Sequence, residues 1–138
     1  MDIAHARVAA SALGVDIYEY LNKLPLERIR EIHVSGVKEA NIHQLSDFHN
    51  EMDDKDIELL EYVMKRTNKL EMITHEFTPL EKDYYLLRDE NGNINTYPTV
   101  SLNGVNPEAK QALEKDLKRL REIVFEYNSN TKKKIEER

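Results

Sequence analysis

The sequence predicts an α/β fold, in which short strands alternate with helices along the chain. Residues 30–36 (REIHVSG) carry the β-branched Ile32 and Val34 before a terminating glycine, and residues 70–77 (LEMITHEF) have a second strand pattern that Pro79 ends. Helical segments lie between and after these strands. This alternation indicates parallel strands joined by helical crossovers, whose functional residues lie at the carboxyl ends of the strands and in the following loops.

Two short helices follow an incomplete strand at the start of the chain. The opening MDIAH has the pattern of a strand end, and ARVAASALG reads as a helix closed by Gly14. The next segment, VDIYEYLNKLP, predicts a second helix with Asp16 as its N-cap and Pro25 at its end.

The segment between the strand at residues 30–36 and the next helix has no clear period. Residues 37–54 are therefore predicted as a long loop, and loops of more than about 12 residues in compact domains tend to be functional or disordered. Asp53 or Asp54 then caps a helix over residues 55–68. Its apolar residues at helical spacing are Ile57, Leu60, Val63 and Met64.

The last part of the chain combines an irregular segment with a long helix. Residues 83–103 predict either an excursion hairpin with a turn at DENGN or an ordered loop. Asn106 as N-cap and Pro107 at the first helical position open a helix over residues 107–128. Its apolar stripe is Leu113, Leu117, Leu120, Val124 and Tyr127. One face of this helix therefore packs on the sheet, and the other faces solvent.

The composition is that of one soluble globular domain, residues 1–138. Apolar residues make up 40% of the chain and charged residues 33%, a balance that argues against low-complexity disorder. No apolar run approaches the roughly 18 residues of a membrane span, and the start of the chain lacks the basic residues and apolar stretch of a signal peptide. We expect a cytoplasmic protein that has no membrane partner.

The absence of cysteine limits the chemistry of this chain. It excludes disulfides, thiolate zinc sites, iron–sulfur ligation and cysteine nucleophiles, so any metal must be held by histidine and carboxylates. The net charge of -6 argues against nucleic acid as a partner, because such binding depends on lysine and arginine contacts to phosphates.

Six histidines and carboxylates lie in or after the predicted strands. They are Asp2, His5, His33, Asp47, His49 and Glu76. Taken singly, each has an ordinary structural interpretation: His33 fits a hydrogen-bonded core histidine, and Glu76 fits an ion pair with lysine or arginine. Taken together, they provide the ligands of oxygen- and nitrogen-preferring divalent metals. We do not include His43 and His75 among the predicted ligands. Strand alternation places His75 on the face opposite Glu76.

Four short motifs occur in the order of a known family. The motifs DIAH, EIHVSG, SDFHN and MITHEF resemble the C-terminal half of a xylose-isomerase-like TIM-barrel family that includes MbnB, the multinuclear iron enzyme of methanobactin biosynthesis. The segment LPLERIREIHVSG is especially similar to the family segment that precedes a ligand histidine. The resemblance covers residues 1–77 closely and the remainder by layout, and endonuclease IV shares the motif order more distantly. It implies a partial (β/α)8 barrel with a long C-terminal helix.

The resemblance also implies two separate metal sites. The two ligand sets are Asp2, His33 and Glu76, and His5, Asp47 and His49. In the family, the first site also uses a bridging glutamate from an earlier strand, and a further metal is held by two histidines of the N-terminal half. The second set has two histidines and one carboxylate, which is the facial pattern of non-haem iron sites with open positions.

The function that the resemblance implies is oxidative peptide modification. In the family, iron and dioxygen modify cysteine residues of a peptide, often with a partner protein that presents the peptide. We therefore expect the iron-binding half of such an enzyme, with zinc or manganese as alternative metals, completed by a missing N-terminal half-barrel or by a homodimer. A xylose-isomerase-like sugar isomerase or a metal-dependent hydrolase is the alternative activity. An inactive truncated remnant that folds by dimerisation is the alternative of another class.

Overall fold

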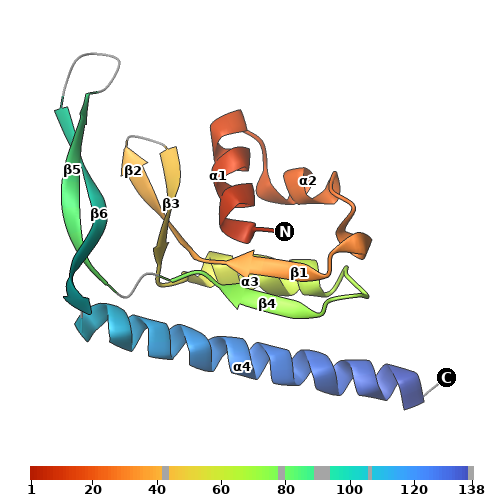
Figure 1. Ribbon diagram of the computed structural model, residues 1–138. Helices are drawn as coiled ribbons and strands as arrows, with labels where there is room; N and C mark the ends of the chain where they lie inside the picture. Colours follow the sequence, from red (N-terminus) through yellow and green to blue (C-terminus); the bar gives the residue numbers. More distant parts are fainter. Residues whose placement is uncertain (42–43, 78–79, 89–93, 106, 137–138) are drawn as a thin grey trace.

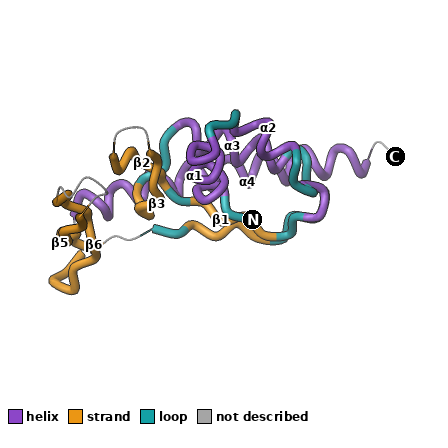
Figure 2. Tube along the Cα trace, turned by 90° about the horizontal axis from the view of Figure 1, so that it is seen from above, coloured by secondary structure: helices purple, strands orange, loops and turns teal. Residues whose placement is uncertain are grey.

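The computed structural model describes residues 1–41, 44–77, 80–88, 94–105 and 107–136 of the chain. Its elements are α1 (Ile3–Leu13), α2 (Ile17–Asn22), η1 (Leu26–Arg28), β1 (Glu31–Val34), β2 (Gly36–Asn41), β3 (Gln44–Asn50), α3 (Asp54–Met64), β4 (Met72–His75), β5 (Leu80–Arg88), β6 (Ile94–Val105) and α4 (Pro107–Glu136). β1 and β4 lie at the centre of the molecule, with α1 and α2 above them and α4 below them in the view of Figure 1. Figure 2 shows the helices gathered on one side of β1.

Two parallel pairings build the central sheet. β1 pairs with β4, with His33 opposite Thr74, and Asp2 forms a parallel bridge to the other side of His33. The His33 N–H donates to the Met1 carbonyl, with a nitrogen–oxygen distance of 2.7 Å. Because α1 and α2 precede β1 and α3 precedes β4, the prediction of parallel strands with helical crossovers is confirmed. The described residues form an open sheet, without barrel closure among them.

Capping residues fix both ends of α1 and the start of α2. The Asp2 carboxylate accepts a hydrogen bond from the His5 N–H at 2.9 Å, so α1 begins earlier in the chain than predicted. Gly14 closes α1 in the left-handed conformation, with φ 63°, as its sequence position predicts. Asp16 caps α2, which confirms the second predicted helix start.

A reciprocal capping box starts α3. The Asp53 carboxylate accepts from the Asp56 N–H at 2.8 Å, and the Asp56 carboxylate accepts from the Asp53 N–H at 3.0 Å. Arg7 of α1 donates to both carboxylates, and Asp56 is fully buried. This contact ties α1 to the start of α3. The buried apolar residues of α3 are Leu59, Leu60, Val63 and Met64.

Residues 37–54 do not form the predicted long loop. β2 and β3 form an antiparallel hairpin over most of this range. The prediction was wrong because register shifts between Gly36 and Val37 and between Glu39 and Asn41 interrupt the two-residue alternation by which a strand is recognised.

β5 and β6 form a second antiparallel hairpin. For this part of the chain the sequence predicted either a hairpin or an ordered loop, and the structure has the hairpin. Its predicted turn at DENGN lies outside the described residues. In Figure 1 this hairpin stands away from the central sheet, beside the start of α4. It therefore lies apart from the parallel strands on which the predicted site depends.

α4 is longer than the helix predicted over residues 107–128. It begins at Pro107, as the sequence predicts, and continues to Glu136, whereas its predicted cap Asn106 lies outside the described residues. Although α4 has 30 residues, neither it nor another helix in the described part of the chain is apolar enough to cross a membrane.

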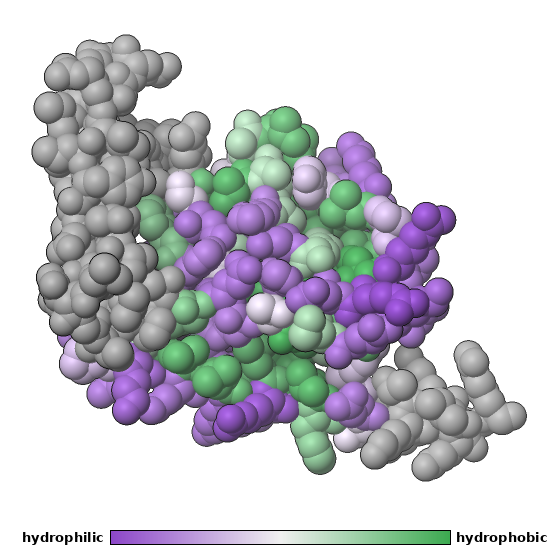
Figure 3. Space-filling model, viewed as in Figure 1, coloured by the Kyte–Doolittle hydropathy of each residue, from purple (hydrophilic) through white to green (hydrophobic). Residues whose placement is uncertain are grey.

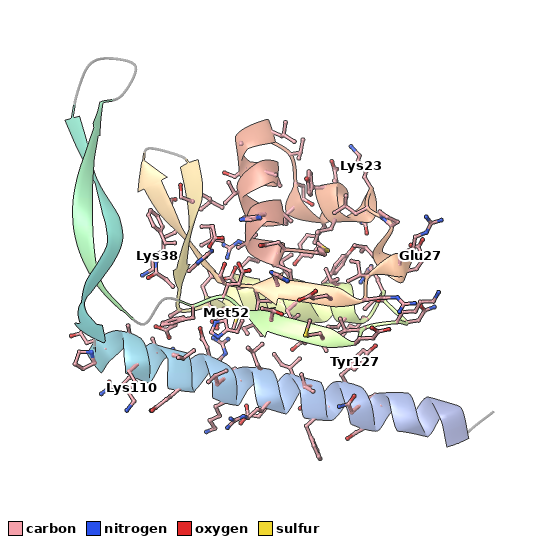
Figure 4. The ribbon with its side chains drawn as sticks, in the orientation of Figure 1. Lys23, Glu27, Lys38, Met52, Lys110 and Tyr127 are labelled. Atoms are coloured by element: carbon pink, nitrogen blue, oxygen red, sulfur yellow. The ribbon has the colours of Figure 1, made fainter. Side chains whose placement is uncertain are left out.

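The hydrophobic core lies between β1 and the helices. Ile32 is 0% exposed and Val34 is 1% exposed. From α4, Leu120 is 8% exposed, and Tyr127 points toward β4 in Figure 4. Other members of this core are Ile3, Leu21, Leu26, Met52, Leu59, Leu60 and Val63. The predicted packing face of the last helix is therefore confirmed at Leu120 and Tyr127.

Hydrophobic residues also reach the surface near β4 and α4. Figure 3 shows them in green along the lower edge of the molecule, among hydrophilic residues. Met72 of β4 is 52% exposed, and Phe125 of α4 is 73% exposed. Both are large apolar side chains on elements that otherwise contribute to the core.

Candidate metal centre

Side chains from several elements meet at the carboxyl end of the parallel sheet. Asp2 and His5 come from the start of α1, His33 from β1, Asp47 and His49 from β3, and Glu76 from the end of β4. The Glu76 N–H continues the pairing of β4 by donating to the Val34 carbonyl at 2.9 Å, which brings Glu76 beside His33. The fold thus brings all six residues predicted from the sequence into one cluster.

Their ligand atoms form three overlapping groups. Within each group, the ligand atoms lie within 4.8 Å of one another. The groups are Asp2 with His33 and Glu76, Asp2 with His5 and Asp47, and Asp47 with His49 and Glu76. Each group therefore contains one imidazole and two carboxylates, and each carboxylate belongs to two groups.

This grouping differs in part from the two separate ligand sets that the resemblance implies. The first set forms one of the three groups. The second set is divided between two groups. His5 and His49 approach the same Oδ2 atom of Asp47, with distances of 3.4 and 3.1 Å from their Nε2 atoms. The second carboxylate is Asp2 in the group of His5 and Glu76 in the group of His49. The sets expected to be separate are therefore continuous with each other.

Asp47 has one satisfied and one unsatisfied carboxylate oxygen. Its Oδ1 accepts hydrogen bonds from the Ser35 hydroxyl at 2.7 Å and from the His49 N–H at 3.1 Å. Its Oδ2 is buried and has no hydrogen-bond partner, although two imidazoles lie near it. Burying a carboxylate oxygen without a partner is costly. A cation held between Asp47 and these imidazoles would remove that cost, so the donor set fits a divalent metal.

His49 occupies the left-handed backbone region. Its φ is 51°, which is uncommon for a residue other than glycine. This backbone conformation places its Nε2 3.1 Å from Asp47 Oδ2 and 3.6 Å from Glu76 Oε2. Unfavourable backbone conformations persist where the surroundings enforce them, and they are concentrated at functional sites.

His33 is held between two carboxylates. Its Nδ1 lies 2.7 Å from Glu76 Oε1, and its Nε2 lies 2.9 Å from Glu31 Oε1. The hydrogen bond with Glu76, followed by that with Glu31, raises the pKa of His33. A hydrogen bond from the Thr74 hydroxyl, followed by that from His33, lowers the pKa of Glu31. The ring orientation of His33 is therefore fixed from both sides.

The sequence did not identify Glu31, Ser35 or Thr74 as part of the site. Glu31 precedes His33 by two positions in a strand, so strand alternation could have placed it on the same face. Ser35 and Thr74 carry no comparable signal, because serine and threonine hydroxyls serve many structural roles.

The cluster is open to solvent on one side. The side chain of His5 is 68% exposed and that of His49 is 42% exposed, whereas those of Asp2 and Asp47 are 17% and 10% exposed. Exposed imidazoles thus lie in front of more buried carboxylates. A cation can enter such a site and retain a position for a further ligand.

His75, which the sequence leaves out of the predicted site, does not join the cluster. The His75 side chain is 6% exposed and lies against the fully buried Asp116 of α4, with Nε2 3.4 Å from Oδ2. Asp116 also accepts a hydrogen bond from the Met52 N–H at 2.9 Å, and Figure 4 shows Met52 at the junction of β3 and the helices. His75 therefore faces away from Glu76, as alternation predicts. His43 lies outside the described residues.

One comparison with known proteins identifies relatives of this chain. A family model described as "RiPP precursor modification enzyme MbnB/TglH/ChrH" matches residues 1–88, where RiPP denotes a ribosomally synthesised and post-translationally modified peptide. The match spans the clustered residues from Asp2 to Glu76. No curated protein and no solved structure gives a significant match.

Proposed function

The chain belongs to the MbnB/TglH/ChrH family of RiPP precursor modification enzymes, and from this premise we propose that it takes part in metal-dependent oxidation of a cysteine-containing peptide. The buried Oδ2 of Asp47, without a hydrogen-bond partner and beside two imidazoles, is the observation that carries this proposal. Positive charge beside this buried oxygen is favourable, and a divalent metal provides it together with open coordination positions.

We propose iron as the metal, with zinc and manganese as alternatives. The residues that would hold it are Asp2, His5, His33, Asp47, His49 and Glu76. Each of the three carboxylates belongs to two of these ligand groups. When bound, iron supplies redox chemistry with dioxygen that oxidises a cysteine of the peptide.

In this proposal, the protein's own residues orient the metal ligands and form the rim at which the peptide binds. Ser35 and the His49 N–H hold Oδ1 of Asp47, which directs Oδ2 toward the imidazoles. His5, with its side chain 68% exposed, forms the rim at which a peptide approaches. The buried side of the cluster, at Asp2 and Asp47, limits access by water.

A second protein segment completes the sheet in this proposal. Within the described residues, β1 is paired on both sides, whereas β4 is paired on one side. Met72 shares a face of β4 with Thr74, near the site, and is 52% exposed. Unpaired strand edges and exposed apolar residues favour association with another chain. The added segment would be the N-terminal half of a barrel or a second copy of this chain.

The proposed function is tested by the intact mass of a peptide. The chain is coexpressed with the proteins and cysteine-containing peptides encoded beside its gene, as wild type and as His49→Ala. We expect an oxidative mass change on a peptide cysteine with the wild type, reduced at least 10-fold in the variant if its imidazole supports the reaction. An unmodified peptide in the presence of metal-loaded wild type would overturn peptide oxidation while leaving the metal site intact.

A further inference from the structure

Glu31 lies next to the candidate metal centre without joining any of its three ligand groups. Side chains of a strand alternate between faces, so Glu31 and His33 share the face opposite the buried Ile32 and Val34. Glu31 Oε1 lies 2.9 Å from His33 Nε2, while His33 Nδ1 points toward Glu76. The two nitrogens of this ring therefore have different partners.

We infer that Glu31 is a positioning residue for His33, which holds a proton on Nε2 and so directs the Nδ1 lone pair toward the cation. This inference rests on the proposed function. A metal-ligating histidine uses one ring nitrogen as ligand and donates the N–H of the other to an acceptor, often a carboxylate. The acceptor fixes the tautomer and the ring rotation, and it increases the basicity of the ligating nitrogen.

Thr74 holds Glu31 in the position that this role requires. The Thr74 hydroxyl donates to the same Oε1 atom, at 2.9 Å. Thr74 lies opposite His33 in the parallel register of β1 and β4, so the backbone of the sheet fixes the distance between them. The hydrogen bond between Thr74 and Glu31 and the contact between Glu31 and His33 therefore hold this imidazole in a fixed position on the sheet.

Packing alone does not explain the role of the Glu31 side chain. Its side chain is 40% exposed, so its removal leaves no buried cavity. Another acidic residue nearby, Glu71, is 62% exposed and pairs with Arg30 at 2.8 Å, away from His33. Glu71 therefore provides a matched control, because its substitution removes the same charge without changing the acceptor of His33.

The test uses Zn²⁺ as the probe and measures its dissociation constant by competition with a chelator. Glu31→Ala is expected to weaken Zn²⁺ binding by about 10- to 100-fold, the usual effect of removing the acceptor of a ligating histidine. Thr74→Val is expected to weaken binding less, because Glu31 remains. Glu71→Ala is expected to match the wild type. Equal urea unfolding midpoints of the apo variants exclude a general loss of structure.

A spectroscopic readout separates positioning from a merely structural role. In the Zn²⁺-loaded wild type, nitrogen-15 NMR is expected to show His33 with a protonated Nε2 and a ligating Nδ1. In Glu31→Ala at saturating Zn²⁺, the Nε2 proton is expected to exchange rapidly with water. Wild-type Zn²⁺ binding with an unchanged affinity in Glu31→Ala would overturn this inference and leave the proposed function standing. No Zn²⁺ binding by the folded wild type would overturn both.

Discussion

At the scale of single residues, Asp47 links the β2–β3 hairpin to the candidate metal centre. One of its oxygens accepts hydrogen bonds from Ser35 and from the His49 N–H, and the other is buried beside two imidazoles. A carboxylate with one oxygen anchored and the other unsatisfied is suited to bind a cation without reorganising. The geometry of the site therefore depends on small side chains around the ligands as well as on the ligands.

The Ser35 hydroxyl is expected to support metal affinity. Ser35→Ala removes the 2.7 Å hydrogen bond to Asp47 while leaving the volume of the buried site nearly unchanged. We expect metal binding to weaken about 10-fold, as for other residues that orient a ligand, and the free energy of unfolding to fall by about 1 kcal/mol. Chelator competition and urea unfolding measure the two effects. An unchanged metal affinity would contradict this role of Ser35.

Asp56 is expected to make the stability of the apoprotein decrease with rising pH. Burial raises the pKa of Asp56 to about 6, against the opposing hydrogen bond and charge of Arg7. Between the usual pKa near 3.8 and about 6, the folded state binds more protons than the unfolded state, so the free energy of unfolding falls as the pH rises. The total effect is on the order of 3 kcal/mol.

Urea unfolding of the chelator-treated apoprotein, as wild type and as Asp56→Asn, measures this contribution across the same pH range. Asparagine retains an oxygen that accepts from Arg7 but does not titrate there. The difference between the two proteins isolates Asp56 from His33 and the other titrating groups. A difference that is constant with pH would show that Asp56 has an ordinary pKa in the folded protein.

At the scale of elements, the parallel strands, the end of α1 and the start of α2 were predictable, whereas the start of α1 and the β2–β3 hairpin were not. Asp16 and Gly14 are local signals, since each acts on its own helix end. The hairpin depends on pairing between segments whose alternation is interrupted by register shifts, so no single segment shows it. Asp47 and His49 were predicted as candidate ligands from their residue types and from the resemblance of SDFHN to a family motif, although a strand rather than a loop carries them.

Gly36 is expected to be essential for the hairpin. A Cβ atom at this position would lie 2.0 Å from the Glu51 carbonyl oxygen and 2.7 Å from that of Asn50. Both atoms belong to the backbone, so Gly36→Ala must shift the chain next to Asp47 and His49. We expect roughly 1–3 kcal/mol of destabilisation and a loss of metal binding.

The matched control for Gly36→Ala is Gly14→Ala. A Cβ atom at Gly14 would point into open space, with no other part of the protein within 4 Å, but the φ of 63° disfavours alanine. This variant is expected to be destabilised by about 1 kcal/mol, because alanine is strained in the left-handed region, and to retain its metal. Equal metal content in the two variants would contradict the account of the hairpin.

At the scale of the whole molecule, the sheet is open and the ligand cluster lies at its carboxyl end. The sequence predicts the parallel arrangement and the six clustered residues, because strand ends with chemically matched side chains are visible in it. The sequence does not predict which of these residues lie together in each ligand group, because the grouping depends on the distances between β3, β1 and the start of α1. The TIM-barrel half and the partner that completes it remain predictions.

Association of the chain is expected to depend on the open side of the sheet. Met72→Lys places a charge on the exposed face of β4 and should prevent association, whereas Phe125→Lys on α4 should not. Light scattering of the purified proteins measures the molar mass. A wild-type mass of two chains that Met72→Lys reduces to one is the expected result for a homodimer. Equal effects of the two substitutions would contradict completion through the sheet.

The central claim, that the cluster binds a metal, is tested most directly by elemental mass spectrometry of anaerobically purified protein. We compare the wild type with Asp47→Asn, which alters a carboxylate shared by two ligand groups, and with Asp54→Asn, whose side chain is 99% exposed on α3. We expect about one or more iron ions per chain in the wild type and in Asp54→Asn, and a large loss in Asp47→Asn. A folded wild type without metal, or equal metal in all three proteins, would contradict the claim.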